Sequence, residues 1–253
     1  MSEKISAKKK MQRIDVILVD RGIAESQTKA QALVMSGVVL ADEKRVEKPS
    51  ESFSTEVSLR LKGDAGSTRF VSRAGLKLEH ALLRFAVDPT GYACIDIGSS
   101  TGGFTDCLLQ KGAVRVVAID SGTNQMVWTL RNDKRIDLRE KTNARNLTQT
   151  DFDREFDLAV VDVSFISATK ILPSIYPLLK KNGKAIVLIK PQFEVRRGEV
   201  GKGGIVRDRK KHERVISEVN GSAETLGFTI EGVIDSPILG AEGNKEFLVL
   251  YGK

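Results

Sequence analysis

A glycine-rich loop with an acidic residue downstream is the feature of the sequence best suited to bind a nucleoside. The loop reads Asp-Ile-Gly-Ser-Ser-Thr-Gly-Gly-Phe-Thr-Asp over residues 96–106 and follows an apolar run typical of a strand. Glycines at 98, 102 and 103 allow a tight turn, and a helix beginning there would direct free N–H groups at a ligand. Asp120 ends the next apolar run, where a carboxylate can accept hydrogen bonds from ribose hydroxyls.

The spacing of the glycines narrows the choice of cofactor. It is not the Gly-x-Gly-x-x-Gly of dinucleotide-binding enzymes, and no Gly-Lys-Ser or Gly-Lys-Thr follows it, as a phosphate-binding P-loop requires. A turn that only joins a strand to a helix is the alternative, but it would not account for the position of Asp120. The residues predicted to form the nucleoside pocket are Asp96, Gly98, Ser99, Ser100, Thr101, Gly102, Gly103, Phe104, Asp120, Asn143 and Asp162.

A second set of polar residues is placed for acid–base chemistry. Asp162 and Lys190 each follow an apolar run typical of a strand. Open α/β sheets bind ligands at the carboxyl ends of their strands. Glu246 begins the last such run, and Lys77 lies on a helix-like segment ahead of the first. Taken singly, each side chain could equally be a solvated strand end, so the pattern alone leaves their role open.

The elements expected to position these residues form an α/β domain. Leu78, Ala81, Leu82 and Phe85 have the spacing of an amphipathic helix, with Ser72 as its candidate N-cap. Six apolar runs alternate with helical stretches, which predicts a mainly parallel sheet covered on both faces. The expected strands are residues 93–97, 114–119, 158–161, 185–189, 229–234 and 246–251.

The front of the chain has a different organisation. Residues 14–19 and 29–35 are expected to be short helices, with Ser26 capping the second. Residues 37–40 and 55–61 are expected to be short strands. The boundaries predicted for the chain are a disordered basic tail at residues 1–10, a small α+β domain at 11–62, a linker at 63–71 and the α/β domain at 72–253.

Composition excludes several classes of protein. The 253 residues are 29% charged and carry a net charge of +7, which fits a polyanionic partner. No run approaches the roughly 18 apolar residues of a membrane span, and no apolar segment follows the basic start as in a secretory signal. Two isolated cysteines, Cys94 and Cys107, and two histidines predict neither a disulfide scaffold nor a metal site. We expect a soluble, cytoplasmic protein.

The glycine-rich loop closely resembles the methyl-donor motif of the FtsJ/RrmJ-like ribose 2′-O-methyltransferases. Ser-Arg-Ala-Gly-Leu-Lys-Leu at 72–78 and Ile-Lys-Pro-Gln-Phe-Glu at 189–194 resemble the TlyA branch, also called haemolysin A. Residues 26–39 and 46–50 resemble its S4 RNA-binding domain. The resemblance covers nearly every segment. It implies a Rossmann-like, S-adenosylmethionine-dependent methyltransferase behind a small N-terminal α+β S4 domain, with cytidine 2′-hydroxyls of ribosomal RNA as substrate.

The resemblance also assigns roles to the four polar residues. The family's Lys-Asp-Lys-Glu tetrad falls on Lys77, Asp162, Lys190 and Glu246, with Lys190 as the candidate general base. A ribose hydroxyl is a poor nucleophile until it loses its proton, whereas a methyl sulfonium is a strong electrophile, so no metal is needed. An unperturbed lysine amine is protonated at pH 7. Desolvation and the second lysine favour the neutral amine while the carboxylates favour the charged one, so the sequence does not fix the balance.

Basic side chains of both domains are expected to hold the RNA. Lysine and arginine contacts to phosphates give affinity and salt sensitivity rather than sequence choice. The S4 pattern often has Arg and Asn-Gly where this chain has Thr28 and Asp42-Glu43, which makes the surface locally less basic. A basic, glycine-rich loop at 202–208 is expected to move and close over substrate. The candidate contacts are Arg13, Arg21, Lys29, Lys44, Arg45, Lys48, Arg73, Lys202 and Arg207.

Functions of other classes compete with this hypothesis. One is a non-catalytic RNA-binding ribosome-assembly factor with a vestigial S-adenosylmethionine pocket, against which the intact tetrad argues. Another is a membrane-active haemolysin, as the older family name suggests, although nothing in the sequence looks like a membrane span. Val163-Ser164-Phe165 is unlike the Pro-Pro-aromatic run of amino-group methyltransferases, and neither cysteine is placed as the nucleophile of a C5-pyrimidine enzyme. The modified nucleotide, the ribosomal subunit and the oligomeric state are left open.

Overall fold

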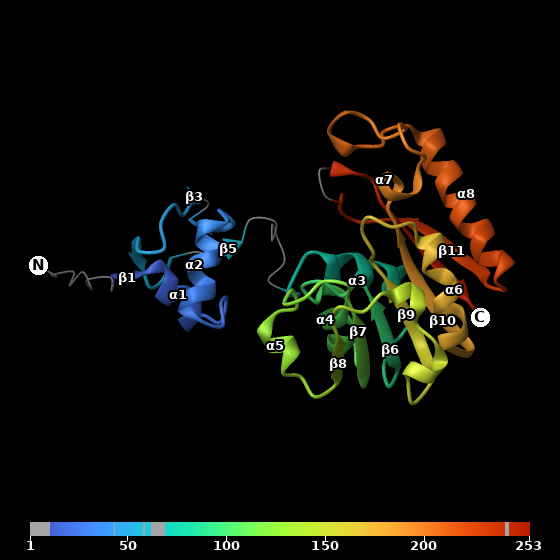
Figure 1. Ribbon diagram of the computed structural model, residues 1–253, viewed down its shortest axis with the longest axis horizontal. Helices are drawn as coiled ribbons and strands as arrows, with labels where there is room; N and C mark the ends of the chain where they lie inside the picture. Colours follow the sequence, from blue (N-terminus) through green and yellow to red (C-terminus); the bar gives the residue numbers. More distant parts are fainter. Residues whose placement is uncertain (1–10, 43, 58, 62–68, 241–242) are drawn as a thin grey trace, which may run out of the picture. The chain divides into compact units, whose positions relative to one another are not determined.

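The computed structural model describes residues 11–42, 44–57, 59–61, 69–240 and 243–253 (Figure 1). The chain divides into two units, Met1–Ser67 and Thr68–Lys253. The predicted basic tail at residues 1–10 lies outside the described residues. So does the predicted linker, except for residues 69–71.

The first unit packs two short helices against short antiparallel strands. Ser26 caps the second helix as predicted, since its Oγ accepts a hydrogen bond from the Lys29 amide (3.3 Å). Ile14, Leu18 and Ala30 are fully buried between the helices and strands. The elements are β1 (Met11–Arg13), α1 (Ile14–Asp20), α2 (Gln27–Met35), β2 (Val39–Ala41), β3 (Lys44–Arg45), β4 (Ser52–Ser54) and β5 (Leu59–Leu61). β1 pairs with β4, and β3, β2 and β5 form a sheet in that order.

The strand predicted at residues 55–61 was placed too early. Among the described residues of this range a strand forms at Leu59–Leu61, and a turn follows β4 because the Val57 amide donates to the Ser54 carbonyl (2.9 Å). Arg21 stabilises this turn, since its guanidinium donates to the carbonyl oxygens of Val57 (2.7 Å) and Thr55 (2.5 Å). The alternation of apolar and polar residues in the sequence did not indicate this turn.

The second unit is built on one seven-stranded sheet, as the alternation of apolar runs predicted (Figure 1). Its order is β11-β12-β10-β9-β6-β7-β8, and β12 is antiparallel to both of its neighbours. The strands β6 to β10 are paired in parallel. The bounds are β6 (Ala93–Ile97), β7 (Arg115–Ile119), β8 (Ile136–Arg139), β9 (Phe156–Val161), β10 (Leu179–Ile189), β11 (Thr229–Asp235) and β12 (Phe247–Gly252).

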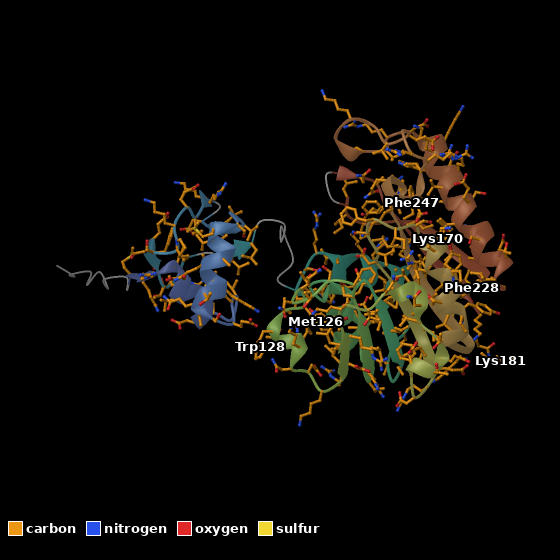
Figure 2. All side chains as sticks on the ribbon, in the orientation of Figure 1. Met126, Trp128, Lys170, Lys181, Phe228 and Phe247 are labelled. Carbon is orange, nitrogen blue, oxygen red and sulfur yellow. The ribbon has the colours of Figure 1, made fainter. Side chains whose placement is uncertain are left out.

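Helices cover both faces of this sheet. Ile95 and Ile97 face one apolar core with α6 (Leu172–Leu178) and α8 (Arg209–Thr225), and Cys94 faces the other with α3 (Ala74–Arg84) and α4 (Gly103–Gln110). Phe247 belongs to the first core and Met126 to the second (Figure 2). The remaining helices are short: α5 (Trp128–Arg131), α7 (Pro191–Glu194), and the 3-10 turns η1 (Ala144–Asn146), η2 (Gln149–Asp151), η3 (Ala168–Lys170) and η4 (Lys202–Gly204).

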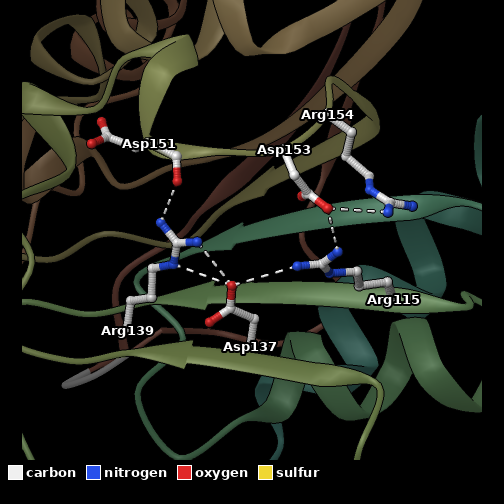
Figure 3. A network of polar contacts seen from close by, with 6 residues as sticks. All are labelled: Arg115, Asp137, Arg139, Asp151, Asp153 and Arg154. Carbon is white, nitrogen blue, oxygen red and sulfur yellow. Dashed lines mark hydrogen bonds and ion pairs between the residues drawn. The ribbon is translucent and has the colours of Figure 1, made fainter.

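The edge strand β8 was not predicted, because charged residues alternate with its two apolar residues and it has no apolar run. Its sequence, Ile-Asp-Leu-Arg, carries two charges and is only partly buried. Asp137 pairs with Arg139 (2.9 Å) and with Arg115 of β7 (3.7 Å) (Figure 3). Arg115 also pairs with Asp153 (3.1 Å), and Arg139 donates to the Asp151 carbonyl (2.8 Å). Cross-strand charge pairs stabilise a sheet without an apolar signal in the sequence.

Ser72 does not cap α3, which corrects the sequence prediction. The helix begins at Ala74 after Arg73, whose backbone is already helical and whose side chain forms no capping bond. The Ser72 hydroxyl instead packs against Gly103, where a Cβ atom would collide with it. Glycine at this position therefore lets the entry of α3 approach the start of α4 closely.

Candidate active site

Four loops of the second unit meet at one rim of the sheet. Gly98, Asp120, Asp162 and Lys190 directly follow β6, β7, β9 and β10. Because these strands are parallel, their carboxyl ends lie side by side. The Asp162 amide donates to the Ile97 carbonyl (2.9 Å), which fixes the end of β9 against the end of β6. The rim is the place where open α/β sheets bind ligands.

Glu246 reaches the same rim from the opposite direction. It immediately precedes β12, which is antiparallel to β10, so the beginning of β12 lies beside the end of β10. Ile189 pairs with Phe247, and Lys190 and Glu246 are the next residues along this register. The antiparallel direction of β12 therefore brings Glu246 beside Lys190.

The four residues of the predicted tetrad form two ion pairs. Lys190 Nζ lies 2.6 Å from Asp162 Oδ1, and Lys77 Nζ lies 2.5 Å from Glu246 Oε2. The second pair is the more buried, with side-chain exposures of 8% and 2% against 11% and 14% for the first. Lys190 also donates a hydrogen bond to Ser164 Oγ (2.9 Å). Amines and carboxylates so close together can orient one another and exchange protons.

A cavity of about 670 Å³ opens at this rim. Gly98, Ser100, Asp120, Asn143 and Asp162, all predicted from the sequence, line it. The other predicted cofactor residues belong to β6, to the loop after it and to α4: Asp96, Ser99, Gly102, Gly103 and Phe104 are buried, and Thr101 is exposed. The cavity is further lined by residues that the sequence did not single out as ligands, namely Gln125, Lys141, Arg145, Ser164 and Phe165.

The cofactor loop is shaped by one glycine and one carboxylate. Gly98 has a φ of +85°, and a Cβ atom there would collide with the Asp162 carbonyl. Glycine therefore allows the loop to touch the end of β9 and to bring Asp162 to the cavity. Asp120 accepts hydrogen bonds from the amides of Ser100 (2.8 Å) and Gly122 (2.7 Å), so its carboxylate is held at the cavity wall.

Unpaired polar atoms beneath the loop indicate the chemistry of a ligand. Asp96 is fully buried, and its Oδ2 accepts a hydrogen bond from Thr105 Oγ1 (2.6 Å). Asp96 Oδ1 and Ser99 Oγ are buried without a hydrogen-bond partner in the described part of the chain. Burial raises the pKa of Asp96 to about 7, and the nearby charge of Asp162 adds to this. Buried polar groups need partners, and the amino-acid end of S-adenosylmethionine offers both donors and acceptors, so these residues fit that cofactor.

Asp96→Asn is expected to stabilise the ligand-free protein increasingly as the pH rises. An unfolded aspartate ionises near pH 3.9, whereas folded Asp96, with a pKa of about 7, stays protonated until neutrality. The stability that this protonated carboxyl contributes is full below pH 4 and is lost as the pH rises to 7. Between about pH 5 and pH 8, the free energy of unfolding of the variant should rise by about 3 kcal/mol relative to that of the wild type. Urea titrations at several pH values measure it; a constant difference would contradict the raised pKa.

Phe165 is a site residue that sequence reasoning missed. Its side chain is 90% exposed although it lines the cavity, and its backbone has a φ of +65°. A bulky side chain in that left-handed conformation is strained, and such strain is concentrated at functional sites. Its ring centroid lies 5.1 Å from that of Phe193, the residue three after Lys190. The sequence showed the aromatic residue after Asp162, but neither its backbone angle nor its exposure.

The predicted RNA contacts lie in both units and differ in their surroundings. Arg13 pairs with buried Asp15 (2.6 Å), Lys29 with Glu25 and Arg45 with Glu47 (3.7 Å), while Arg21 is bound to backbone carbonyls. In the described structure these four therefore have intramolecular partners. The side chains of Lys44, Lys48, Lys202 and Arg207 are exposed, and Arg73 is half-buried at the start of α3.

The loop predicted to close over substrate is partly anchored. Asn244 accepts a hydrogen bond from the Val206 amide (3.0 Å) and donates one to the Gly204 carbonyl (2.9 Å). His212 bonds the Val206 carbonyl through Nε2 (2.8 Å). These contacts bind the middle of the loop to His212 and to Asn244, which lies two residues before Glu246. The movement of Lys202 and Arg207 stays a prediction.

Both units match known families. Residues 70–253 match the family described as FtsJ-like methyltransferase, and residues 12–56 match the S4 domain. The chain is 41% identical to the 16S/23S rRNA (cytidine-2′-O)-methyltransferase TlyA of Mycobacterium tuberculosis, over 94% of this chain and 88% of that protein. It is 40% identical to hemolysin A of Brachyspira hyodysenteriae, over 94% of this chain and 99% of that protein.

A solved structure supports the fold of the second unit. An S-adenosylmethionine-dependent methyltransferase of Mesorhizobium loti aligns with a TM-score of 0.52 at 16% identity, over 69% of this chain and 96% of that one. The Rossmann-like architecture and the family resemblance inferred from the sequence are thereby confirmed. The chain belongs to the FtsJ-like methyltransferase family and carries an S4 domain ahead of its methyltransferase domain.

Proposed function

We propose that this protein transfers a methyl group from S-adenosylmethionine to a ribose 2′-hydroxyl of ribosomal RNA, with cytidine as the target, in the cytoplasm. The observation that carries the proposal is the pair of ion pairs, Lys190–Asp162 and Lys77–Glu246, at the carboxyl end of the sheet, where Asp162 also lines a cavity of about 670 Å³. The name of the M. tuberculosis relative, an rRNA (cytidine-2′-O)-methyltransferase, supports both the substrate and the hydroxyl.

The cofactor would be held by the loop after β6 and the carboxylate after β7. Asp120 would accept hydrogen bonds from the ribose hydroxyls, and Asp96 and Ser99 would meet the amino-acid end with their unpaired atoms. Asn143 lines the cavity further along. S-adenosylmethionine, when bound, supplies an electrophilic methyl group, so the protein needs to add only orientation and a base.

The neutral amine of Lys190 would accept the proton of the ribose hydroxyl. Asp162 and Ser164 hold its amine at 2.6 Å and 2.9 Å, which fixes where the accepting nitrogen lies. Proton abstraction makes the hydroxyl oxygen nucleophilic at the moment it is aligned with the methyl carbon. Lys77 and Glu246 would supply a fixed, buried charge pair beside this nitrogen and orient the substrate.

The substrate RNA would be bound by both domains. The S4 domain presents exposed Lys44 and Lys48, and the methyltransferase domain presents Lys202 and Arg207. Such residues contribute affinity through phosphates, and folded RNA is recognised largely by its shape. Phe165 offers an exposed ring at the cavity, on which the base of the target nucleotide could stack.

Phe165→Leu is expected to lower kcat/KM for RNA by about 5- to 150-fold, because stacking of a base on an aromatic ring is worth about 1–3 kcal/mol. Leucine keeps the strained backbone and much of the volume but lacks the flat ring. S-adenosylmethionine affinity should change little. Steady-state kinetics with varied RNA measures the effect, and Leu83→Ala, another exposed apolar residue (77%), is the control. Unchanged kcat/KM in Phe165→Leu would exclude Phe165 from substrate binding.

Labelled S-adenosylmethionine tests the function directly. Purified protein should transfer label to the RNA of ribosomal subunits isolated from cells that lack the gene. Subunits bound without any transfer would support the assembly-factor alternative instead. No helix among the described residues is long and apolar enough to cross a membrane. Release of dye from liposomes by the protein, in the absence of cofactor, would nevertheless favour the haemolysin alternative.

A further inference from the structure

Two chain segments surround the amine of Lys190, and each follows one member of the Lys190–Asp162 pair. The segment after Asp162 brings Ser164 Oγ to 2.9 Å from Lys190 Nζ and carries the exposed Phe165. The helix α7, directly after Lys190, places the Phe193 ring centroid 6.0 Å from Lys190 Nζ. The position of this amine therefore depends on how the two segments are held together.

Glu194, the last residue of α7, joins the two segments through both carboxylate oxygens. Oε1 accepts a hydrogen bond from the Ala168 amide (2.7 Å), and Oε2 accepts one from Ser167 Oγ (2.5 Å). Ser167 also caps η3, because its Oγ accepts a hydrogen bond from the Thr169 amide (3.1 Å). An amide side chain offers an acceptor at only one of these two positions, and its NH₂ group would face Ser167 Oγ, which already accepts a hydrogen bond from the Thr169 amide.

This carboxylate is an unusual choice for a purely structural contact. Burial raises the pKa of Glu194, and Glu218 of α8 adds to the shift, while the bonds from Ser167 and Ala168 oppose it. No lysine or arginine of the described chain contributes to offset the burial. Glu194 is partly buried, and a carboxylate withdrawn from water without a counter-ion stabilises a fold poorly. The two simultaneous hydrogen bonds account for its presence better than packing does.

We propose that Glu194 is a positioning residue for the methyl-transfer step. It fastens the segment after Asp162 to the segment after Lys190, so that Ser164 keeps the Lys190 amine in place and Phe165 stays at the cavity rim. Glu194 acts through these residues and does not itself meet the RNA. This role rests on the proposed function, since it presumes that Lys190 is the base.

Glu194→Gln tests the proposal in the full-length protein. It should lower kcat by about 10- to 100-fold, the effect of misplacing a catalytic group by about 1 Å, while S-adenosylmethionine affinity changes little. Glu218→Gln, a nearby exposed carboxylate on α8, should keep the wild-type kcat. Ser167→Ala removes one of the two donors and should lower kcat in the same direction, so it serves if Glu194→Gln does not fold. An unchanged kcat in Ser167→Ala and in any folded Glu194→Gln would overturn the proposal.

A spectroscopic measurement separates this proposal from the proposed function. The chain has one tryptophan, so a Trp128→Phe, Phe165→Trp protein reports on the segment after Asp162 alone. Adding Glu194→Gln should lower the fluorescence anisotropy of that tryptophan, because the segment is released. Unchanged anisotropy would overturn the positioning role. The readout needs no RNA, so it stands even if the wild-type protein fails to methylate ribosomal RNA.

Discussion

Lys190→Ala is expected to lower methyl transfer by a factor of about 10²–10⁴, the range that a general base contributes. The amine lies 2.6 Å from Asp162 at the rim of the sheet, where Asp162 lines the cavity. The cofactor loop and Asp120 are untouched by the change, so S-adenosylmethionine should still bind. Single-turnover transfer to ribosomal RNA and calorimetric titration of the cofactor measure the two effects separately.

A matched control lies on the same strand. Lys184 of β10 is also ion-paired, with Glu231 (2.6 Å), but it lies away from the rim and is 36% exposed. Lys184→Ala should therefore transfer methyl groups at the wild-type rate. Full activity in Lys190→Ala would remove Lys190 from the mechanism.

Breaking the Lys77–Glu246 pair should have the largest effect on stability. Both side chains are almost completely buried, at 8% and 2% exposure. Removing one partner leaves the other as an uncompensated buried charge, which costs about 3–5 kcal/mol. Lys77→Met and Glu246→Leu should each show this loss of unfolding free energy in urea titrations. Glu231→Ala, which breaks an exposed pair, should cost no more than about 1 kcal/mol.

The double variant Lys77→Met, Glu246→Leu separates folding from chemistry. Apolar residues of similar volume can replace a buried ion pair at little cost, so most of the lost stability should return. Methyl transfer should not return, because the charge pair beside Lys190 is still missing. A double variant that is both stable and fully active would show that this pair is structural only.

The sequence predicted those parts of the site that depend on strand ends. Asp162 and Lys190 follow apolar runs, and parallel strands place such residues at one rim whatever the details of packing. The glycine at 98 was recognisable because its role is a backbone conformation that few other residues adopt. Side-chain type and spacing are sufficient for features of this kind.

Features that arise from tertiary contacts were not predictable in the same way. Strand β8 has no apolar run because ion pairs to β7 and the η2 region hold it. Ser72 has the residue type of a helix cap, but its hydroxyl packs against Gly103 at the start of α4 and has no hydrogen-bond partner among the described residues. Phe165 and Glu194 lie in motifs that were read from the sequence, yet the exposure of one and the two hydrogen bonds of the other depend on segments folding against each other.

The chemical position of the transferred methyl group tests the central claim most directly. Ribosomal RNA treated with the protein and S-adenosylmethionine would be digested to nucleosides and analysed by mass spectrometry beside RNA treated with Lys190→Ala. We expect the methyl group on the ribose of cytidine in the first sample and, after the same short reaction, about 10²–10⁴-fold less of it in the second. A methyl group on a base, or undiminished ribose methylation with Lys190→Ala, would contradict the assignment of Lys77, Asp162, Lys190 and Glu246 as the machinery of 2′-hydroxyl methylation.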